Sequence, residues 1–327
     1  MMLNLLALNV GFRMGGKASL SGKGVWLAAL GILYPGLAMG CACGCGVFEV
    51  GTSAMFPEGT GGMVFNTFAY QNQDQNWGGN SQRPSIYNPD KNIATAFQSV
   101  GLQYMFNRSW GVEAELPWAY RSFSTISSLT GRQVNMKWWS LGDIRLHGLY
   151  TGFSEDLSSG IDFGLKLPTG NFNQEDPGND IDRDTQIGTG STDVLLGGFH
   201  RGNLSDHFRL DWFFQEESDL PVMTQGNYRP GFEWDGALGM NYRGFRIGSA
   251  NVAPIAQILF SERTRDFGSD ANSPNSGFTR LLVSPGLEIH MHPFDLYADV
   301  EVPVVQHFNG YQLVAPVAFK VNLSYMF

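Results

Sequence analysis

The last stretch of the chain, Leu313–Phe327, reads LVAPVAFKVNLSYMF and decides the fold. The side chains on one face are all apolar: Ala315, Val317, Phe319, Val321, Leu323, Tyr325 and Phe327. The other face includes Lys320, Asn322 and Ser324, and this period of two is typical of a β-strand. In a soluble sandwich such an exposed face at a chain end is prone to aggregate, whereas in a closed membrane barrel it meets lipid. The stretch therefore favours the final strand of a membrane β-barrel.

The composition of the whole chain agrees with a barrel. Charged residues make up 16% of the 327 residues, below the roughly 25% of soluble domains. Aromatic residues reach 13%, yet the mean hydropathy is only −0.14, which excludes a helical membrane protein. Strands that alternate apolar outward and polar inward residues produce this combination. The net charge of −9 and the lack of a basic stripe argue against a nucleic-acid partner.

The N-terminus has the features of a secretory signal peptide. Val25–Leu37 is the one long apolar run, and Arg13, Lys17 and Lys23 precede it. At about 13 residues it is shorter than the roughly 20 that a membrane-spanning helix needs, but it has the length of a signal-peptide core. Small residues at Ala38–Gly40 supply a cleavage site. We therefore expect residues 1–40 to be a signal peptide; a buried helix is the alternative.

The three cysteines of the chain, Cys41, Cys43 and Cys45, follow that cleavage site within a segment of residues 41–61 that we expect in the periplasm. Cys41 is a candidate lipid anchor, although Ala38 stands where a lipobox prefers Leu. Three thiolates suit a soft metal ion, but they do not complete a tetrahedral site. A flexible tail with free or oxidised thiols is the third interpretation.

From residue 62 to residue 327 the sequence predicts one all-β domain, a membrane-spanning antiparallel up-and-down barrel of about twelve strands. Trp110–Ser122 has the clearest interior alternation, with Val112, Leu116 and Tyr120 opposite Glu113 and Glu115. Long polar connectors are expected at 72–92, 123–137, 169–190, 216–228 and 262–277, and short turns lie between them. Outer-membrane barrels alternate long external loops with short periplasmic turns. An even strand count places both termini in the periplasm; a soluble β-sandwich is the alternative.

Short motifs at strand ends add a family resemblance. Leu167-Pro168-Thr169-Gly170, the acidic loop that follows, and Gly188-Thr189-Gly190-Ser191 with Asp193 resemble a family of bacterial outer-membrane transporter barrels associated with phenol meta-degradation. That family is distantly similar to the long-chain fatty-acid channels. Pro254–Gln257 and the terminal Phe327 fit it too, and a last strand ending in Phe is similar to the signal that the barrel-assembly machinery reads. The resemblance implies passage of small molecules across the outer membrane.

The inward-facing charged residues are the candidates for lining a permeation path. They are Glu113, Glu115, Arg121, Asp143, Arg145, His147, Asp162, Lys166, Arg209, Asp211, Glu233, Asp235, Glu288, Asp299, Glu301 and Lys320. Acidic residues outnumber basic ones, and an acidic lumen favours cations. The alternative is that these charges pair across strands, for example Glu115 with Arg145, and fill the barrel.

The sequence suggests three other kinds of site, two for metal ions and one catalytic. The acidic loop holds Asp176, Asp180, Asp182 and Asp184, which begin like an EF-hand loop but lack its glycine and closing glutamate, so a solvated loop is the alternative. Glu288, His290 and His292 share spacing that suits a metal ion near the periplasmic rim. A membrane phospholipase needs a Ser–His pair on the outward wall, and the assigned outward faces contain no convincing one.

The sequence therefore predicts a monomeric outer-membrane channel for small molecules or ions, with no cofactor and no enzymatic activity. Its expected partners are outer-membrane lipid, the barrel-assembly machinery and the solutes. The alternative is a structural or partner-binding barrel whose Cys41–Cys45 segment binds a soft metal or docks a periplasmic redox or metal protein.

Overall fold

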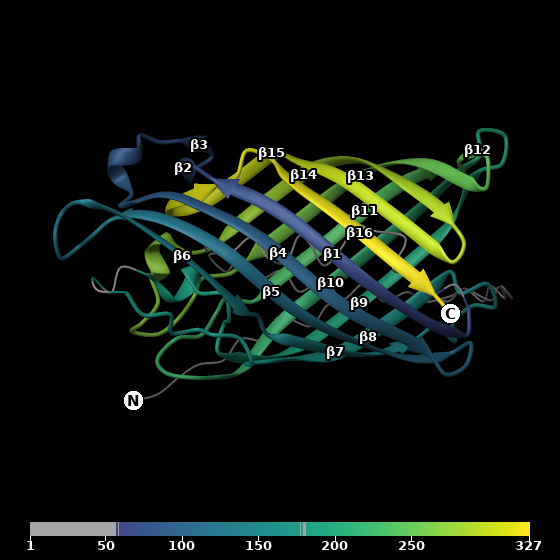
Figure 1. Ribbon diagram of the computed structural model, residues 1–327, viewed down its shortest axis with the longest axis horizontal. Helices are drawn as coiled ribbons and strands as arrows, with labels where there is room; N and C mark the ends of the chain where they lie inside the picture. The colour runs from purple at the N-terminus through teal and green to yellow at the C-terminus, as the bar shows by residue number, and fades with distance from the viewer. Residues whose placement is uncertain (1–56, 58, 177, 179–180) are drawn as a thin grey trace, which may run out of the picture. The chain divides into compact units, whose positions relative to one another are not determined.

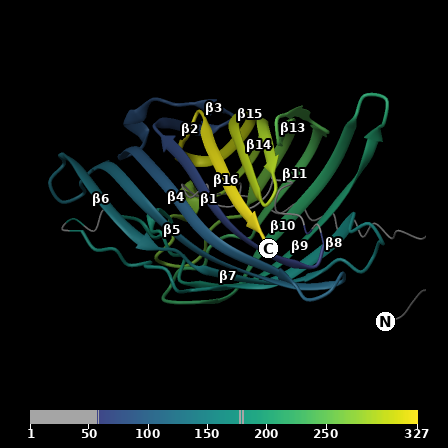
Figure 2. The ribbon, with the colours of Figure 1, turned by 45° about the vertical axis from the view of Figure 1, so that its right-hand side comes forward.

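The computed structural model describes residues 57, 59–176, 178 and 181–327, which form a closed antiparallel β-barrel (Figure 1). In this described part, twelve of sixteen strands build the wall. They are β1 (Gly61–Gln73), β4 (Asp90–Met105), β5 (Trp110–Ile126), β7 (Ile144–Tyr150), β8 (Ser159–Leu167), β9 (Ser191–Ser205), β10 (Leu210–Thr224), β11 (Glu233–Tyr242), β13 (Ala250–Arg263), β14 (Phe278–Met291), β15 (Phe294–Val314) and β16 (Ala318–Met326). Neighbouring strands follow one another in sequence and run obliquely to the barrel axis (Figure 2). The predicted fold is confirmed.

Short elements extend the wall at its ends. They are β2 (Gln75–Gly79), β3 (Ser81–Gln82), β6 (Gln133–Leu141), β12 (Phe245–Ile247) and the 3₁₀ turns η3 (Ser85–Tyr87), η4 (Arg183–Thr185) and η5 (Ser273–Asn275). β6 continues the line of β7 along β5, but the register slips by one residue between them. Glu115 pairs with Arg145, whereas Trp118 pairs with Leu141. This slip is a β-bulge at Gly142–Asp143, and it redirects the Asp143 side chain.

The final strand closes the barrel. β16 pairs with β1 from Met63 opposite Met326 to Gln71 opposite Ala318. Gly62 and Phe327 then exchange two backbone hydrogen bonds of 2.8 Å each. A Cβ at Gly62 would lie 2.3 Å from the Phe327 ring, so a larger residue there would push this terminal aromatic ring aside. The seam has no open edge, which removes the aggregation hazard that the last strand would otherwise present.

The two faces of the wall differ as the alternation predicted. Leu323, Val112 and Phe214 point outward and remain 47%, 44% and 39% exposed, whereas Lys320 and Asn322 point inward and are fully buried. Aromatic pairs ring one end of the outward face, including Trp110 with Tyr150, Tyr242 with Phe245 and Phe294 with Tyr325. An apolar outward band with an aromatic girdle is the surface that a bilayer requires. The barrel therefore spans a membrane.

The two ends of the barrel differ in their connectors. One end, the long-loop end, carries residues 74–89, 127–132, 168–190, 225–232, 264–277 and 315–317. The other, the short-turn end, carries residues 106–109, 151–158, 206–209, 243–249 and 292–293, together with Gly61 and the C-terminus (Figure 1). Most connectors at the long-loop end are longer than those at the short-turn end, as predicted. The connectors 127–132 and 315–317 are short exceptions, and there the neighbouring strands extend beyond the rest of the wall.

Two predicted loops prove to be largely strand. β5 reaches Ile126 and β6 starts at Gln133, so 123–137 is a hairpin with only a six-residue connection, residues 127–132. Likewise β10 continues through most of 216–228, to Thr224. On the hairpin the apolar side chains face inward, where Phe123, Met136 and Trp138 join a buried cluster, and the exposed face is polar. On β10 the stretch Glu216–Asp219 is polar on both faces. These extensions therefore lack the apolar outward face by which the other strands were recognised.

The predicted signal peptide and the Cys41–Cys45 segment lie outside the described residues. Within the described residues, no helix is long and apolar enough to cross a membrane.

Candidate functional site

A cavity of about 150 Å³ occupies the half of the barrel interior nearer the long-loop end. Strands β7 to β13 supply one side of it, and strands β1, β4 and β5 supply the opposite side. Connectors 168–190 and 225–232 cover it. The cavity therefore lies in the lumen directly beneath two of the long connectors.

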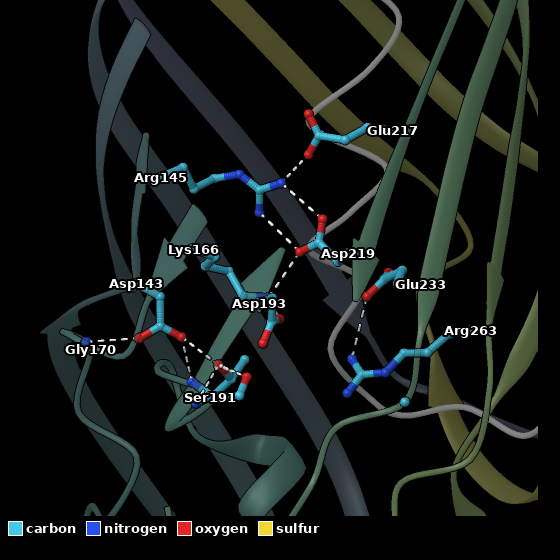
Figure 3. Close-up of polar contacts among 12 residues, drawn as sticks. Asp143, Arg145, Lys166, Gly170, Ser191, Asp193, Glu217, Asp219, Glu233 and Arg263 are labelled. Carbon is cyan, nitrogen blue, oxygen red and sulfur yellow. Dashed lines mark hydrogen bonds and ion pairs between the residues drawn. The ribbon is translucent and has the colours of Figure 1, made fainter. Parts of the chain in front are cut away.

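A charged wall faces the cavity from strands β7 to β13 (Figure 3). Arg145 on β7 forms an ion pair with Glu217 and a second with Asp219, 3.1 Å away on β10. Lys166 on β8 lies 2.5 Å from Asp193 on β9 and 2.9 Å from Asp219. These side chains are nearly buried, and each base contacts two carboxylates, as buried charges require.

The same wall continues to β13. Arg263 contacts Glu233 on β11 at 3.6 Å and Asp266 in the connector 264–277 at 3.1 Å. Asp266 also accepts hydrogen bonds from the Tyr228 hydroxyl at 2.9 Å and the Gly231 backbone N–H at 2.8 Å. The wall is thereby joined to two of the connectors that border the mouth.

A mostly neutral wall lies opposite. Its side chains at the cavity include Thr67 and Ala69 on β1, Phe97 and Ser99 on β4, and Pro117 and Ala119 on β5. Glu115 on β5 is the charged member of this wall. The ion pairs of Arg145, Lys166 and Arg263 run along the charged wall, from β7 to the connector 264–277. These paired charges line one side of the cavity.

The connector 168–190 folds into the mouth and is fastened to the inner wall at two points. At the bulge, Asp143 accepts hydrogen bonds from the Gly170 N–H at 2.9 Å and from the Thr189 N–H at 2.8 Å. On β5, Arg121 donates to the Thr185 carbonyl at 2.5 Å and is itself 1% exposed. Asp143 and Arg121, predicted as permeation residues, therefore hold the loop in place.

Arg183, within this loop, forms part of the cavity roof. Its guanidinium carbon lies 4.7 Å from the ring centres of both Phe172 and Tyr228, and Nη2 donates to the Thr189 carbonyl at 3.1 Å. Desolvation lowers the pKa of Arg183 below its ordinary value. Such a cation between two aromatic rings is stabilised by their π faces and fixes the two connectors against each other.

Gly170 and Gly188, which belong to the motifs that carry the family resemblance, have a packing role. A Cβ at Gly170 would lie 2.8 Å from the Gly188 Cα, and a Cβ at Gly188 would lie 2.4 Å from the Gly170 carbonyl carbon. The two limbs of the loop cross in direct backbone contact, so residues 167–170 and 188–191 determine how the loop folds inward.

Other predicted lumen residues lie deeper. Nearer the short-turn end, His147 Nδ1 is 3.3 Å from Asp162, and Glu113 accepts from Gln103 at 2.8 Å. On β15 and β16, Lys320 pairs with Glu301 at 3.3 Å. Three more predicted residues, Asp235, Glu288 and Asp299, are buried on the inward face. The interior also has an apolar cluster of Phe213, Ala237, Ile255, Leu259, Leu282 and Tyr297, with Phe199 packed on it.

Two predicted lumen residues lie at the rim. Arg209 is exposed in the 206–209 turn with φ 54°, where it donates to the Tyr242 hydroxyl at 3.3 Å. Asp211 is bound by Arg243 at 2.9 Å, and Arg243 also holds Asp206. Arg209 lies in the turn and not on the strand because the turn comes three residues later than the alternation indicated, and Asp211 sits at the first inward position of β10.

Several residues of the charged wall were not predicted. Glu217 and Asp219 fell in a predicted loop, Asp193 in a strand of ambiguous parity, and Arg263 in another predicted loop. The signal that could have found them is their spacing, since Glu217 and Asp219 continue the inward parity of Phe213 and Gln215 on β10.

The two candidate metal sites, in the acidic loop and at Glu288, His290 and His292, have the following contacts. Asp176 accepts from the Gly178 and Ile181 N–H groups, as in a solvated turn, while Asp180 lies outside the described residues. His290 lies between Glu288 at 3.6 Å and Asp295 at 3.0 Å through different ring nitrogens. His292 is in the 292–293 turn.

One outward Ser–His pair was missed. Ser159 Oγ lies 2.6 Å from His200 Nδ1. Within residues 57, 59–176, 178 and 181–327, no carboxylate is hydrogen-bonded to His200, so the orienting group of a triad is not formed there.

Comparison with known proteins supplies a fold. No family model matches the chain, and no curated protein matches it in sequence. Among solved structures, the COG4313 outer membrane channel from Pseudomonas putida F1 is similar over 85% of this chain and 100% of its own, with TM-score 0.60 and 11% identity. The β domain of the Bordetella autotransporter BrkA aligns with 82% of this chain and 100% of its own at 16% identity and TM-score 0.49. The chain therefore has the barrel fold of an outer-membrane channel.

Proposed function

We propose that this protein is an outer-membrane channel for small polar solutes, with a mild preference for cations. The observation that carries the proposal is the cavity between the charged wall and a mostly neutral wall. Paired charges that filled the barrel would lie across the lumen, whereas the ion pairs of Arg145, Lys166 and Arg263 run along one side. Such a path leaves space for water and a small solute.

The cation preference is supported by the side chains that line the cavity. Six of them are acidic, namely Glu115, Asp143, Asp184, Asp193, Asp219 and Glu233, and four are basic, namely Arg145, Lys166, Arg183 and Arg263. The excess of carboxylates lowers the energy of a cation at the constriction and raises that of an anion. A small excess among paired groups gives a mild preference.

The proposed orientation places the long loops outside the cell and both chain ends in the periplasm. It rests on the unequal connectors of the two barrel ends and on the rule that outer-membrane barrels keep short turns in the periplasm. We further propose a monomer, assembled through the strand that ends in Phe327. We propose no enzymatic activity for it.

The test of conduction is a planar-bilayer recording of the purified full chain under a salt gradient. Stable current steps whose reversal potential favours the cation are expected. Electrically silent protein that is nonetheless folded, as judged by its heat-dependent gel migration, would contradict the proposal.

The test of orientation is labelling of intact cells with a membrane-impermeant maleimide. Ser128→Cys, in the 127–132 connector, is expected to react, whereas His207→Cys, in the 206–209 turn, is expected to react only after cell lysis. The reverse pattern would place the long loops in the periplasm.

A further inference from the structure

We propose that His147, Asp162 and Glu217 form a binding site for one divalent transition-metal ion inside the barrel, just below the cavity. The three side chains come from β7, β8 and β10. One ligand atom from each, a ring nitrogen of His147 and one carboxylate oxygen each of Asp162 and Glu217, lies within 4.8 Å of the other two. The inference goes beyond solute passage, since a barrel that carries no current would still hold these side chains.

The strand between the two carboxylates, β9, has no side chain at this level because its residue there is a glycine. Gly197 pairs with Asp162 on one side and with Glu217 on the other. A Cβ at Gly197 would lie 2.4 Å from Asp162 Oδ1 and 2.7 Å from Oδ2. A side chain at position 197 would therefore displace the Asp162 carboxylate from the place where it approaches the other two ligands.

The site is close to the lumen and not sealed in the wall. The Asp162 and Glu217 side chains are 19% and 12% exposed. Each of His147 and Glu217 is two residues nearer the short-turn end than a cavity residue, Arg145 and Asp219 respectively. An ion in the cavity has a short path to the three ligands.

The local charge favours a cation. Glu113 lies directly opposite His147 across β5 and β7, which adds a third carboxylate to Asp162 and Glu217. Arg145 pairs with Glu217, but its guanidinium is shared with Asp219. A carboxylate has two oxygens, so Glu217 can pair with Arg145 and still offer a ligand.

The ligand types indicate the class of metal. An imidazole nitrogen with two carboxylate oxygens suits borderline ions such as Zn²⁺ or Co²⁺, whereas Ca²⁺ and Mg²⁺ prefer oxygen ligands alone. Rotation of the flexible Glu217 side chain brings all three ligands toward one ion at bonds of about 2.0–2.2 Å. Water completes the coordination, so the ion remains exchangeable.

The experiment uses Co²⁺ as the probe with the full-length chain in detergent. Cys41, Cys43 and Cys45 are replaced by Ser to remove competing thiolates. One equivalent of Co²⁺ is expected to bind with visible d–d absorption that Zn²⁺ abolishes. His147→Ala and Asp162→Asn should each weaken binding at least about tenfold, the lower limit for losing even an outer partner of a metal site.

Two matched controls separate the site from general effects. His290→Ala also removes a histidine flanked by two carboxylates, but those contact opposite ring nitrogens, so binding should be unchanged. Gly197→Ala should weaken binding, whereas Gly236→Ala should not, because its Cβ would meet only the Gln215 carbonyl at 3.6 Å.

The outcomes are decisive without any current measurement. Failure of the cysteine-free protein to bind Co²⁺, or equal binding by the folded Asp162→Asn and Gly197→Ala variants, would overturn the site and identify Arg145 as the cation that balances these carboxylates. Loss of conduction with Co²⁺ binding intact would instead contradict only the proposed channel. Asp162→Asn is isosteric and keeps the test valid if His147→Ala does not fold.

Discussion

Asp143 accepts two hydrogen bonds from Thr189, one from its backbone N–H at 2.8 Å and one from its hydroxyl at 2.6 Å. The carboxylate stands at the β-bulge in the wall, and Thr189 closes the loop that covers the cavity. A second oxygen of Asp143 binds Gly170, at the other end of the same loop. One buried side chain thus holds both limbs of the loop in the mouth.

Asp143→Asn should release this loop. The amide keeps the shape but replaces one acceptor oxygen by a donor that faces other donors, and leaving buried groups unpaired costs about 1–3 kcal/mol. We expect larger and noisier single-channel currents and faster proteolysis within residues 168–190. Asp206→Asn, in an exposed turn, is the control. Unchanged current noise and unchanged cleavage in Asp143→Asn would mean that the loop is held by other contacts.

Asp219→Asn should reduce the preference for cations. Asp219 contacts both Arg145 and Lys166, so its neutralisation makes the constriction one charge more positive. Arg145 keeps Glu217 and Lys166 keeps Asp193, which allows the barrel to fold. The reversal potential under a salt gradient should move toward the anion. Asp211→Asn, at the rim, should leave it nearly unchanged, and an equal shift in both variants would exclude the charged wall as the selective element.

The fold was predictable because lipid imposes one rule on every strand. Val112 and Leu323 point outward and Lys320 inward, as their alternation indicated. The rule ends with the apolar band. Residues 123–126 and 216–224 continue as strand beyond it, and there sequence alternation could not separate strand from loop.

The site was less predictable because it depends on contacts between strands that are not neighbours. Arg145 and Lys166 were identified as inward charges, but their partner Asp219 lies on a strand extension. The bulge that turns Asp143 toward Thr189 requires a register slip that no local pattern reveals. Likewise, His147 on β7 and Glu217 on β10 approach each other across two intervening strands.

Ser158→Ala should raise the pKa of Asp156 in the 151–158 turn. Hydrogen bonds from the Ser158 hydroxyl, the Ser158 N–H and the Ser154 hydroxyl hold that pKa at about 2. Because folding lowers the pKa of this carboxyl group, its ionised form stabilises the fold at pH values above the ordinary pKa near 3.9. This contribution is lost as the pH falls toward about 2. Carboxyl carbon NMR over roughly pH 2 to 5 should find a higher midpoint in the variant. Ser140→Ala is the control; a wild-type midpoint near the ordinary value would refute the assignment.

Val321→Arg should destabilise the barrel. Val321 lies midway along β16, outward, beside Phe68 of β1 and Ala298 of β15. An arginine on the lipid face near the bilayer centre costs about 2–4 kcal/mol, and close to the interface about 0–1 kcal/mol. Ile247→Arg on β12, at the short-turn end and 65% exposed, is the matched control. Guanidinium titration of protein folded in lipid vesicles should separate the two variants by that difference. Equal stabilities would mean that Val321 does not face hydrocarbon, and the outward face of the barrel would then require a protein partner.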